Sequence, residues 1–415
     1  MALKKFLTLY REQEDKPFIF FAMLCGFLIT AEYAITKPTS NSIFLSHYSV
    51  QLYPYAWLLT VPVNFLVVSL YNRFLDRLGC FKVFLCTTVG TIFINLLSGL
   101  FVERFPPLSF LLYIWKDLYV LLMFQQVWSL IHTKIDLKKA KYLYGIIFGV
   151  SGVGAVFGSL FPGFLAIKIG SEPLLFMTLP LYLLIIFSYD QMLKKLGKRG
   201  IEGLKFHDIQ GGVALIRCST TLKFILLIVV LMQLSSTIMD YQFNMFLKER
   251  YPFQDERTEF YGRLWGIINL MKLSIQFFAT FLLLKVLGLR RSHFVVPSIL
   301  LGNAILNLMQ PAFGVITYSF SMIKSFDYSI FNIIKEMLYI PLKTSEKFKA
   351  KAIIDVFAYR SAKALASFFV LGMEFLLPGR LPFAYSYGPL ALFMFWIFAL
   401  FFYFRKKEEQ KLLEA

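Results

Sequence analysis

Long runs of apolar residues alternate with short polar or basic segments along the whole 415-residue chain. A run of about 20 apolar residues is long enough to cross the hydrocarbon core of a bilayer as a helix. The alternation therefore predicts a series of membrane-spanning helices. We place the spans at 17–37, 52–71, 83–102, 108–131, 143–166, 173–190, 223–244, 258–283, 294–310, 312–340, 353–377 and 384–404.

The longest polar stretch, 191–222, divides these spans into two sets of six and is rich in Gly and Lys, as is typical of a linker. We predict an all-α integral membrane protein with twelve transmembrane helices in two pseudo-symmetric six-helix bundles. The bundles occupy 17–190 and 223–404, joined by a cytoplasmic linker and flanked by cytoplasmic tails at 1–16 and 405–415.

Composition excludes an ordinary soluble protein. Hydrophobic residues make up 58% of the chain and charged residues 16%, and the mean hydropathy is +0.64. Soluble domains carry about 25% charged residues. The chain has too little polar surface to face water.

The charge balance is strongly basic, with 43 Lys and Arg against 25 Asp and Glu, or +18 in total. Most of these cations lie in the tails and in alternate loops, a pattern that places both termini in the cytoplasm. Because this excess orients the spans, it does not indicate a nucleic-acid partner, and we expect none. We expect membrane lipid around a monomer.

Eight cations remain inside the predicted spans, where each costs roughly 2.5–3.5 kcal/mol and is therefore a candidate for function. They are Lys37, Lys116, Arg263, Lys272, Lys324, Lys335, Arg360 and Lys363. Acidic residues lie within or beside the same spans: Glu32, Asp117, Asp240, Asp327, Glu336, Asp355 and Glu374.

For any one of these residues, pairing or snorkelling to the interface is as plausible as contact with a substrate. Lys324 and Asp327, for example, are close enough in a helix to touch. As a set, a surplus of Lys and Arg at low dielectric favours a small anionic substrate, and both side chains bind phosphate well.

The two halves are related in sequence. An offset of 210 residues carries Asp117 onto Asp327, and nearly the same offset carries Leu78-Gly79 onto Leu287-Gly288 and Glu32-Tyr33 onto Asp240-Tyr241. Parallel six-span repeats are typical of major-facilitator transporters, whose substrate sites lie near the midplane between the halves. Chance matching of short basic loops is the alternative.

The loop between the second and third spans contains Asp76-Arg77-Leu78-Gly79, which resembles the Asp-Arg-x-Gly signature of major-facilitator proteins. The resemblance predicts a gating loop formed by Asp76, Arg77 and Gly79, in which the aspartate caps a neighbouring helix. An ordinary positive-inside loop is the other reading.

The fifth span contains Gly145, Gly149, Gly152, Gly154 and Gly158, with two GxxxG spacings. Small residues allow close helix packing, which here serves either a static interface or a flexing one.

The sequence contains no motif that is typical of an enzyme active site. No phosphate-binding Gly-rich loop, catalytic triad or metal-ligand spacing is present, so we expect no enzyme, cofactor or metal. Aromatic residues near span ends, such as Tyr53, Tyr55 and Trp57, are interpreted as interfacial anchors.

The segment Lys335-Glu336-Met337-Leu338-Tyr339-Ile340-Pro341-Leu342, with the Lys- and Ala-rich residues 347–356, resembles a signature of the bacterial and plastid ATP/ADP translocase family. Weaker matches lie around Trp115-Lys116-Asp117 and Ile238-Met239-Asp240-Tyr241. The resemblance implies nucleotide transport across a bacterial inner membrane, as ATP/ADP exchange or as uptake with protons.

Carried over from the family, the charged positions of spans one, four, seven and eleven are Lys37, Asp117, Asp240 and Lys363. The chain departs from the family's pattern in the first span and at 360–364, which leaves the nucleotide or anion open.

The resulting hypothesis is a secondary active transporter of nucleotides, ATP-binding, that works by alternating access about a central basic cavity. Lys37 and Lys363, supported by Lys324 and Arg360, would bind phosphate. The carboxylates of Asp117, Asp240, Asp327 and Glu336 would exchange ion-pair partners or couple transport. The alternatives are a proton-coupled carrier of another organic or phosphorylated anion and, from another class, a non-transporting scaffold or sensor.

Overall fold

The computed structural model describes residues 16–135, 137–196, 215–217, 219–282, 288–339, 354, 358–376 and 382–413. Every regular element in these ranges is helical, as the apolar runs predict. The helices before the predicted linker are α2 (Lys16–His47), α3 (Tyr53–Leu78), α4 (Cys80–Phe101), α5 (Pro107–Lys134), α6 (Leu137–Ile169), α7 (Ser171–Phe176) and α8 (Leu179–Leu196). Those after it are α11 (Thr220–Arg250), α12 (Gln254–Leu282), α13 (Gly288–Met309), α14 (Phe313–Phe326), α15 (Asn332–Tyr339), α17 (Tyr359–Leu376) and α18 (Tyr387–Leu413).

Nine helical segments of the described chain are long and apolar enough to cross a membrane. The predicted spans 258–283, 312–340 and 353–377 also contain helices, but these are more charged or shorter. Six of the eight in-span cations belong to these three spans. The in-span cations are therefore concentrated on α12, α14, α15 and α17, and the count of twelve spans stays a prediction.

The first helix is longer than the predicted span, which ends at residue 37. Helix α2 passes through Pro38 and continues to His47. Proline removes one backbone donor and weakens the helix around it, and hydroxyl side chains donate to nearby carbonyls in such apolar helices. Here Thr39 Oγ1 donates to the Ile35 carbonyl at 2.8 Å and Ser40 Oγ to the Lys37 carbonyl at 3.1 Å.

Two predicted spans are interrupted. Residues 177–178 form a turn between α7 and α8, where Thr178 Oγ1 donates to the Leu175 carbonyl at 2.6 Å. Between α14 and α15, Asp327–Phe331 forms a π-helical segment. Such segments are frequent at functional sites, and this one begins at a predicted site residue.

The chain forms two compact units. The first comprises Met1–Tyr48, Pro62–Lys205 and Pro252–Leu270, and the second Ser49–Val61, Phe206–Tyr251 and Met271–Ala415. Each unit therefore includes one segment from the other side of the predicted linker.

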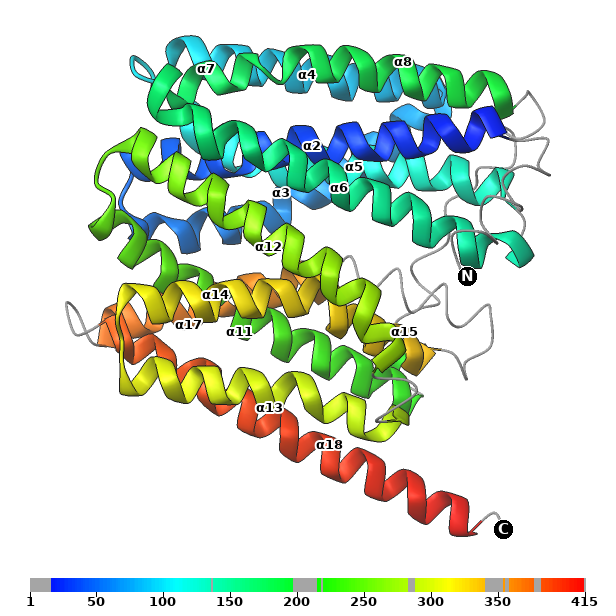
Figure 1. The fold of residues 1–415 in the computed structure, drawn as a ribbon, viewed down its shortest axis with the longest axis vertical. Helices are drawn as coiled ribbons and strands as arrows, with labels where there is room; N and C mark the ends of the chain where they lie inside the picture. The colour runs from blue at the N-terminus through cyan, green and yellow to red at the C-terminus, as the bar shows by residue number, and fades with distance from the viewer. Residues whose placement is uncertain are drawn as a thin grey trace. The chain divides into compact units, whose positions relative to one another are not determined.

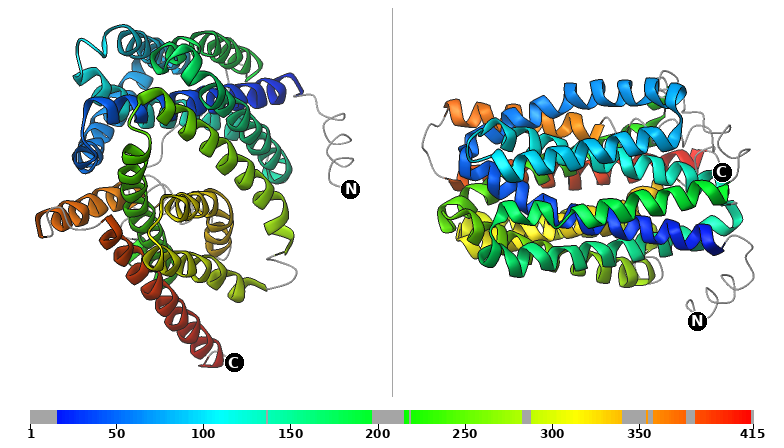
Figure 2. Two further views of the ribbon diagram at one scale, coloured as in Figure 1. Left: turned by 60° about the vertical axis from the view of Figure 1, so that its left-hand side comes forward. Right: turned by 90° about the horizontal axis from the view of Figure 1, so that it is seen from above.

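The first helix of each predicted half is the central helix of its unit. In the first unit, α2 packs against α5, α6, α7 and α8. Its axis is roughly parallel or antiparallel to those of α5, α6 and α8 (Figures 1 and 2). In the second, α11 packs against α14, α17 and α18 (Figure 1). Apolar side chains fill both cores, among them Phe18 and Met123 in the first and Ile225 and Trp396 in the second.

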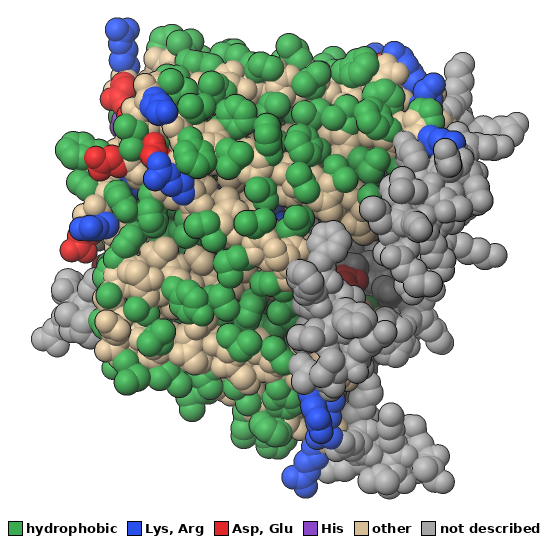
Figure 3. All heavy atoms as spheres, viewed as in Figure 1, with side chains coloured by type: hydrophobic (Ala, Val, Ile, Leu, Met, Phe, Trp, Pro, Cys, Tyr) green, Lys and Arg blue, Asp and Glu red, His purple; other side chains and the backbone are tan. Residues whose placement is uncertain are grey.

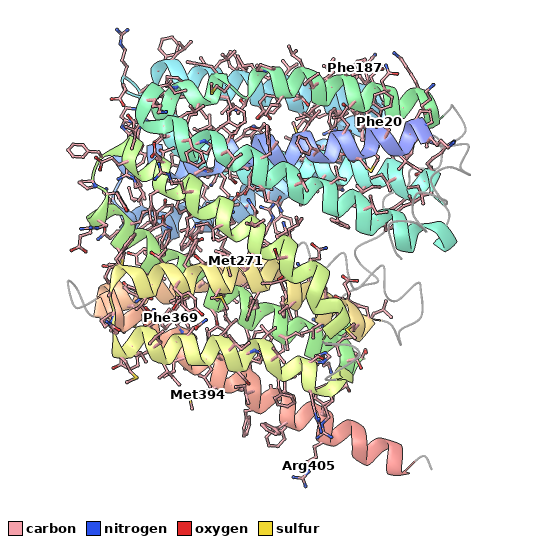
Figure 4. The ribbon with its side chains drawn as sticks, viewed as in Figure 1. Phe20, Phe187, Met271, Phe369, Met394 and Arg405 are labelled. Atoms are coloured by element: carbon pink, nitrogen blue, oxygen red, sulfur yellow. The ribbon has the colours of Figure 1, made fainter. Side chains whose placement is uncertain are left out.

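The outer surfaces of the units are apolar. On the face shown in Figure 3, hydrophobic side chains cover the middle of the helices, whereas Lys, Arg, Asp and Glu gather toward their ends. Phe20 and Phe187 in the first unit and Phe369 and Met394 in the second mark such positions in Figure 4, with Phe187 52% exposed and Met394 57%. Apolar surface of this extent requires lipid, so the chain is an integral membrane protein.

Two loops that correspond in the predicted repeat share an unusual backbone. Gly79, before α4, has φ +78°, and Gly288, at the start of α13, has φ +70°. A side chain is strained in this left-handed region, which glycine adopts freely. The shared geometry agrees with the sequence correspondence of these loops.

The glycines of α6 differ in role. A Cβ on Gly154 or Gly158 would lie 2.3 Å from the Phe27 carbonyl oxygen or 2.1 Å from that of Ala31, both on α2. A Cβ on Gly145 or Gly149 would meet nothing within 4 Å. The second GxxxG pair therefore allows close packing against α2, whereas the first does not.

We predict that Gly158→Ala lowers the melting temperature of the purified protein in detergent, because the added methyl group forces α6 away from α2. Overpacking of this kind costs about 1–3 kcal/mol. The matched change Gly149→Ala is expected to leave the melting temperature unchanged or slightly higher, since alanine favours helix and has open space there. Equal melting temperatures for the two variants would contradict this account of the packing.

Candidate functional site

Lys37 of α2, a predicted phosphate-binding residue, lies against aromatic rings in the first unit. Its Nζ is 3.4 Å from the centroid of the Trp265 ring on α12 and 5.5 Å from that of Tyr33. Trp265 is only 5% exposed. A lysine ammonium over an indole face gains about 0.5–2 kcal/mol, more when it is desolvated.

Asp117 of α5 lies in the same unit. Tyr33 Oη donates a hydrogen bond to Asp117 Oδ1 at 2.9 Å, and Lys116 Nζ lies 4.0 Å from that oxygen. Lys116 also donates to the Tyr113 carbonyl at 2.9 Å and lies over the Tyr113 ring at 3.4 Å. Helices α2 and α5 thus bring together four residues: Tyr33, Lys37, Lys116 and Asp117. We call these four residues with Trp265 the first-unit cluster.

Glu32 of α2 is fully buried beside the first-unit cluster. Its carboxylate accepts hydrogen bonds from Thr36 Oγ1 at 2.5 Å, Tyr182 Oη at 2.6 Å and Tyr119 Oη at 2.8 Å. Buried charges persist in proteins only when they are hydrogen-bonded or paired. These three hydroxyl groups supply that compensation within the unit.

The N-terminal part of α12 is fixed to the first unit by polar contacts, which place Trp265 beside Lys37. Arg257, which lies just before the predicted span 258–283, is fully buried and donates to the Ser42 carbonyl at 2.8 Å and to Ser46 Oγ at 2.5 Å. Asp255 Oδ1 accepts from the backbone N–H and the hydroxyl group of Ser171 at 2.8 and 2.6 Å.

Arg263, one of the in-span cations, also lies on this part of α12. It pairs with Glu259 and donates to the Gly163 carbonyl at 2.7 Å. These contacts join α12 to α6 and satisfy the charge of Arg263 within the unit.

In the second unit, Lys324 of α14 reaches across to α11. Its Nζ lies 3.0 Å from Ser236 Oγ and 3.4 Å from Asp240 Oδ2. Lys324 is 8% exposed. Asp240 also accepts from Asn244 Nδ2 at 3.1 Å. The pair is therefore largely desolvated and tied to the central helix.

Asp327 likewise reaches α11, where Gln233 Nε2 donates to both of its carboxylate oxygens at 3.0 and 3.1 Å. The i,i+3 spacing had indicated that Lys324 and Asp327 could pair with one another. The described ion pair of Lys324 is instead with Asp240, because both side chains point toward the neighbouring helix.

Lys363 of α17, the other predicted phosphate-binding lysine, also lies over a tryptophan. Its Nζ is 5.3 Å from the centroid of the Trp57 ring, contributed by α3. The Trp57 ring packs against Tyr53 in a stacked pair, with centroids 5.6 Å apart, and edge-on against Tyr241 at 6.4 Å. Glu374 accepts hydrogen bonds from Tyr241 at 2.8 Å and from Tyr385 at 2.9 Å.

The interpretation of Tyr53 and Trp57 as interfacial anchors is wrong. Tyr53 is fully buried and Trp57 is 1% exposed, whereas Tyr55 of the same segment is half exposed. Position near a span end cannot distinguish a lipid-facing ring from an inward one. The helical spacing of Tyr53 and Trp57, four residues apart on one face, was the available signal.

The remaining predicted site residues are more scattered. Arg360 lies on α17 three residues before Lys363 and is half-buried, as is Glu336 on α15. Arg77 and Gly79 of the predicted gating loop are exposed, and the side chain of Asp76 lies outside the described part of the chain. So do Asp355 and residues 340–353 of the translocase-like segment.

A metal site is not indicated by the described residues, in which no three His, Cys, Asp or Glu side chains are grouped so as to hold an ion. The site chemistry that the structure describes is thus that of Lys and Arg with aromatic and carboxylate partners. Such groups bind anions and, through rings, flat molecules.

The fold and the charges inside each unit define a helical integral membrane protein with charged groups buried among its helices. Residues 307–403 match the model of a family described as the TLC ATP/ADP transporter, which confirms the translocase resemblance over that segment. The matched residues include Lys324, Asp327, Glu336, Arg360 and Lys363. No curated protein sequence matches the chain.

Two solved structures of the nucleoside transporter NupG have the same fold. One, of a mutant form, is 11% identical with a TM-score of 0.66 and covers 94% of this chain and 99% of its own. The other is 10% identical with a TM-score of 0.59 and covers 94% and 98%. At such low identity these likenesses establish the fold alone.

We predict that Lys324→Met destabilises the protein, because it leaves the largely desolvated Asp240 carboxylate without its cation. Removing one partner of a buried pair costs about 3–5 kcal/mol. The double variant Lys324→Met with Asp240→Asn is expected to recover much of the lost melting temperature, since the uncompensated charge is gone. A double variant no more stable than Lys324→Met would contradict the pairing.

Proposed function

We propose that the chain is a secondary active transporter that moves nucleotides across a bacterial inner membrane, by alternating access of two six-helix halves. The observation that carries the proposal is the placement of Lys37 and Lys363 inside the membrane-embedded units, each ordered against an indole ring. The family match over 307–403 supports a nucleotide as the substrate.

Charge selects among the possible substrates. A nucleoside is uncharged, and a site for it needs hydrogen bonds and stacking but gains nothing from several buried ammonium groups. Each intramembrane cation that is retained carries a cost, which a phosphorylated substrate offsets through charge-assisted hydrogen bonds. The described cations therefore favour a nucleotide over the nucleoside named for the structural relatives.

Roles follow from the contacts. Lys37 and Lys363, with Lys324 and Arg360 in support, bind the phosphate groups. When no substrate is bound, Asp117 pairs with Lys116 and Asp240 pairs with Lys324. Asp327 and Glu336 complete the charge balance of the second unit. Substrate binding then moves Lys324 from its carboxylate partner, and Lys37 and Lys363 from their ring contacts, to the phosphate groups.

The test is exchange in proteoliposomes loaded with unlabelled ADP, with uptake of labelled ATP, ADP and phosphate measured separately. We predict uptake by the wild-type protein and at least a tenfold loss in Lys37→Gln and in Lys363→Gln, because each variant loses a phosphate-binding cation. Lys194→Gln is the matched control, since Lys194 is an exposed lysine paired with Asp190 at 2.5 Å.

No uptake of any nucleotide by the wild-type protein would contradict the proposal, as would full activity in both variants. Repeating the assay with an imposed pH gradient distinguishes exchange from proton-coupled uptake. Uptake that depends on the gradient and not on internal ADP would replace antiport with symport.

A further inference from the structure

The two lysines assigned to phosphate share a feature that their sequence positions do not suggest. Each has its ammonium group against the ring of a tryptophan that comes from the opposite side of the predicted linker. Trp265 follows the linker but belongs to the first unit with Lys37, and Trp57 precedes it but belongs to the second unit with Lys363. Both rings are enclosed, with 5% and 1% of their surface exposed.

The tryptophans are themselves held firmly. Trp265 lies on α12, whose N-terminal part is fixed by the buried Arg257 and by Asp255. Trp57 packs between Tyr53 and Tyr241. A fixed ring restricts the flexible lysine chain to one place, so less conformational freedom is lost when the lysine binds an anion.

A ring face also attracts an ammonium group less strongly than a phosphate oxygen does. The indole therefore holds the lysine without preventing its transfer to a phosphate. A ligand without phosphate gains nothing from the positioned ammonium group, so the arrangement favours phosphorylated substrates over their nucleosides.

We propose that Trp265 and Trp57 are positioning residues that order Lys37 and Lys363 for the phosphate groups of the substrate and so determine the preference for nucleotides over nucleosides. This inference rests on the proposed function. It assigns the specificity to two aromatic residues that act through the lysines.

The test compares Trp265→Leu with Trp265→Phe, and Trp57→Leu with Trp57→Phe, in the proteoliposome assay. We expect the leucine variants to raise KM for labelled ADP about tenfold with little change in the maximal rate, since the lysine remains but is no longer ordered. The phenylalanine variants retain a ring face and are expected to stay within about threefold of wild type.

Competition supplies a second readout. The ratio of the concentrations of adenosine and ADP that inhibit uptake by half is expected to fall about tenfold in the leucine variants. Trp128→Leu is the matched control, because Trp128 stacks on Phe148 at 4.5 Å in the first unit and should leave both readouts unchanged. The double variant Lys37→Gln with Trp265→Leu should be no worse than Lys37→Gln alone.

A wild-type protein that transports no nucleotide would refute the proposed function. Wild-type transport combined with an unchanged KM and an unchanged competition ratio in both leucine variants would refute this inference alone. It would also be refuted if the phenylalanine variants lost as much as the leucine variants, or if the double variant were additively worse, since either result means that the rings act only as packing.

Discussion

The free-energy cost of a charge inside a membrane-embedded protein is the constraint from which the rest of the structure follows. Each such charge costs roughly 2.5–3.5 kcal/mol at the membrane centre even on insertion scales, so the described ones are compensated by partners. Lys324 has Asp240, Arg263 has Glu259, and Glu32 has three hydroxyl groups. Lys37 and Lys363 are placed against indole rings, where a later anion can still compete for them.

This constraint also explains how the helices are distributed. The two most apolar helices, α2 and α11, lie at the centres of their units. The other strongly apolar helices form the outer surfaces. The more charged α12 and the shorter α14 and α17 pack against neighbours that supply their partners, as α12 does through Arg257 and α14 through Lys324. Close backbone contact at Gly154 and Gly158 keeps α6 tight against α2, which carries Glu32 and Lys37.

Much of the fold could be predicted from the sequence, because runs of apolar residues and the Gly79 and Gly288 loops are local signals. The number of spans was harder to predict, since charged or short helices do not form the long apolar runs by which spans are recognised. Partners were not predictable: the spacing of Lys324 and Asp327 allowed a local pair, whereas the described contacts of the two side chains are with Asp240 and Gln233 of the neighbouring α11. Trp57 was misread for the same reason, because burial depends on which helix lies next to a ring.

The most direct measurement of the central claim uses ADP that carries an acyl group on its terminal phosphate, since an amine beside that phosphate takes up the acyl group and releases ADP. Mass spectrometry of the labelled protein then identifies the acylated lysines. The account predicts labelling of Lys37 and Lys363 that excess ADP prevents and adenosine does not. Labelling confined to exposed lysines such as Lys194, or labelling that ADP does not prevent, would contradict it.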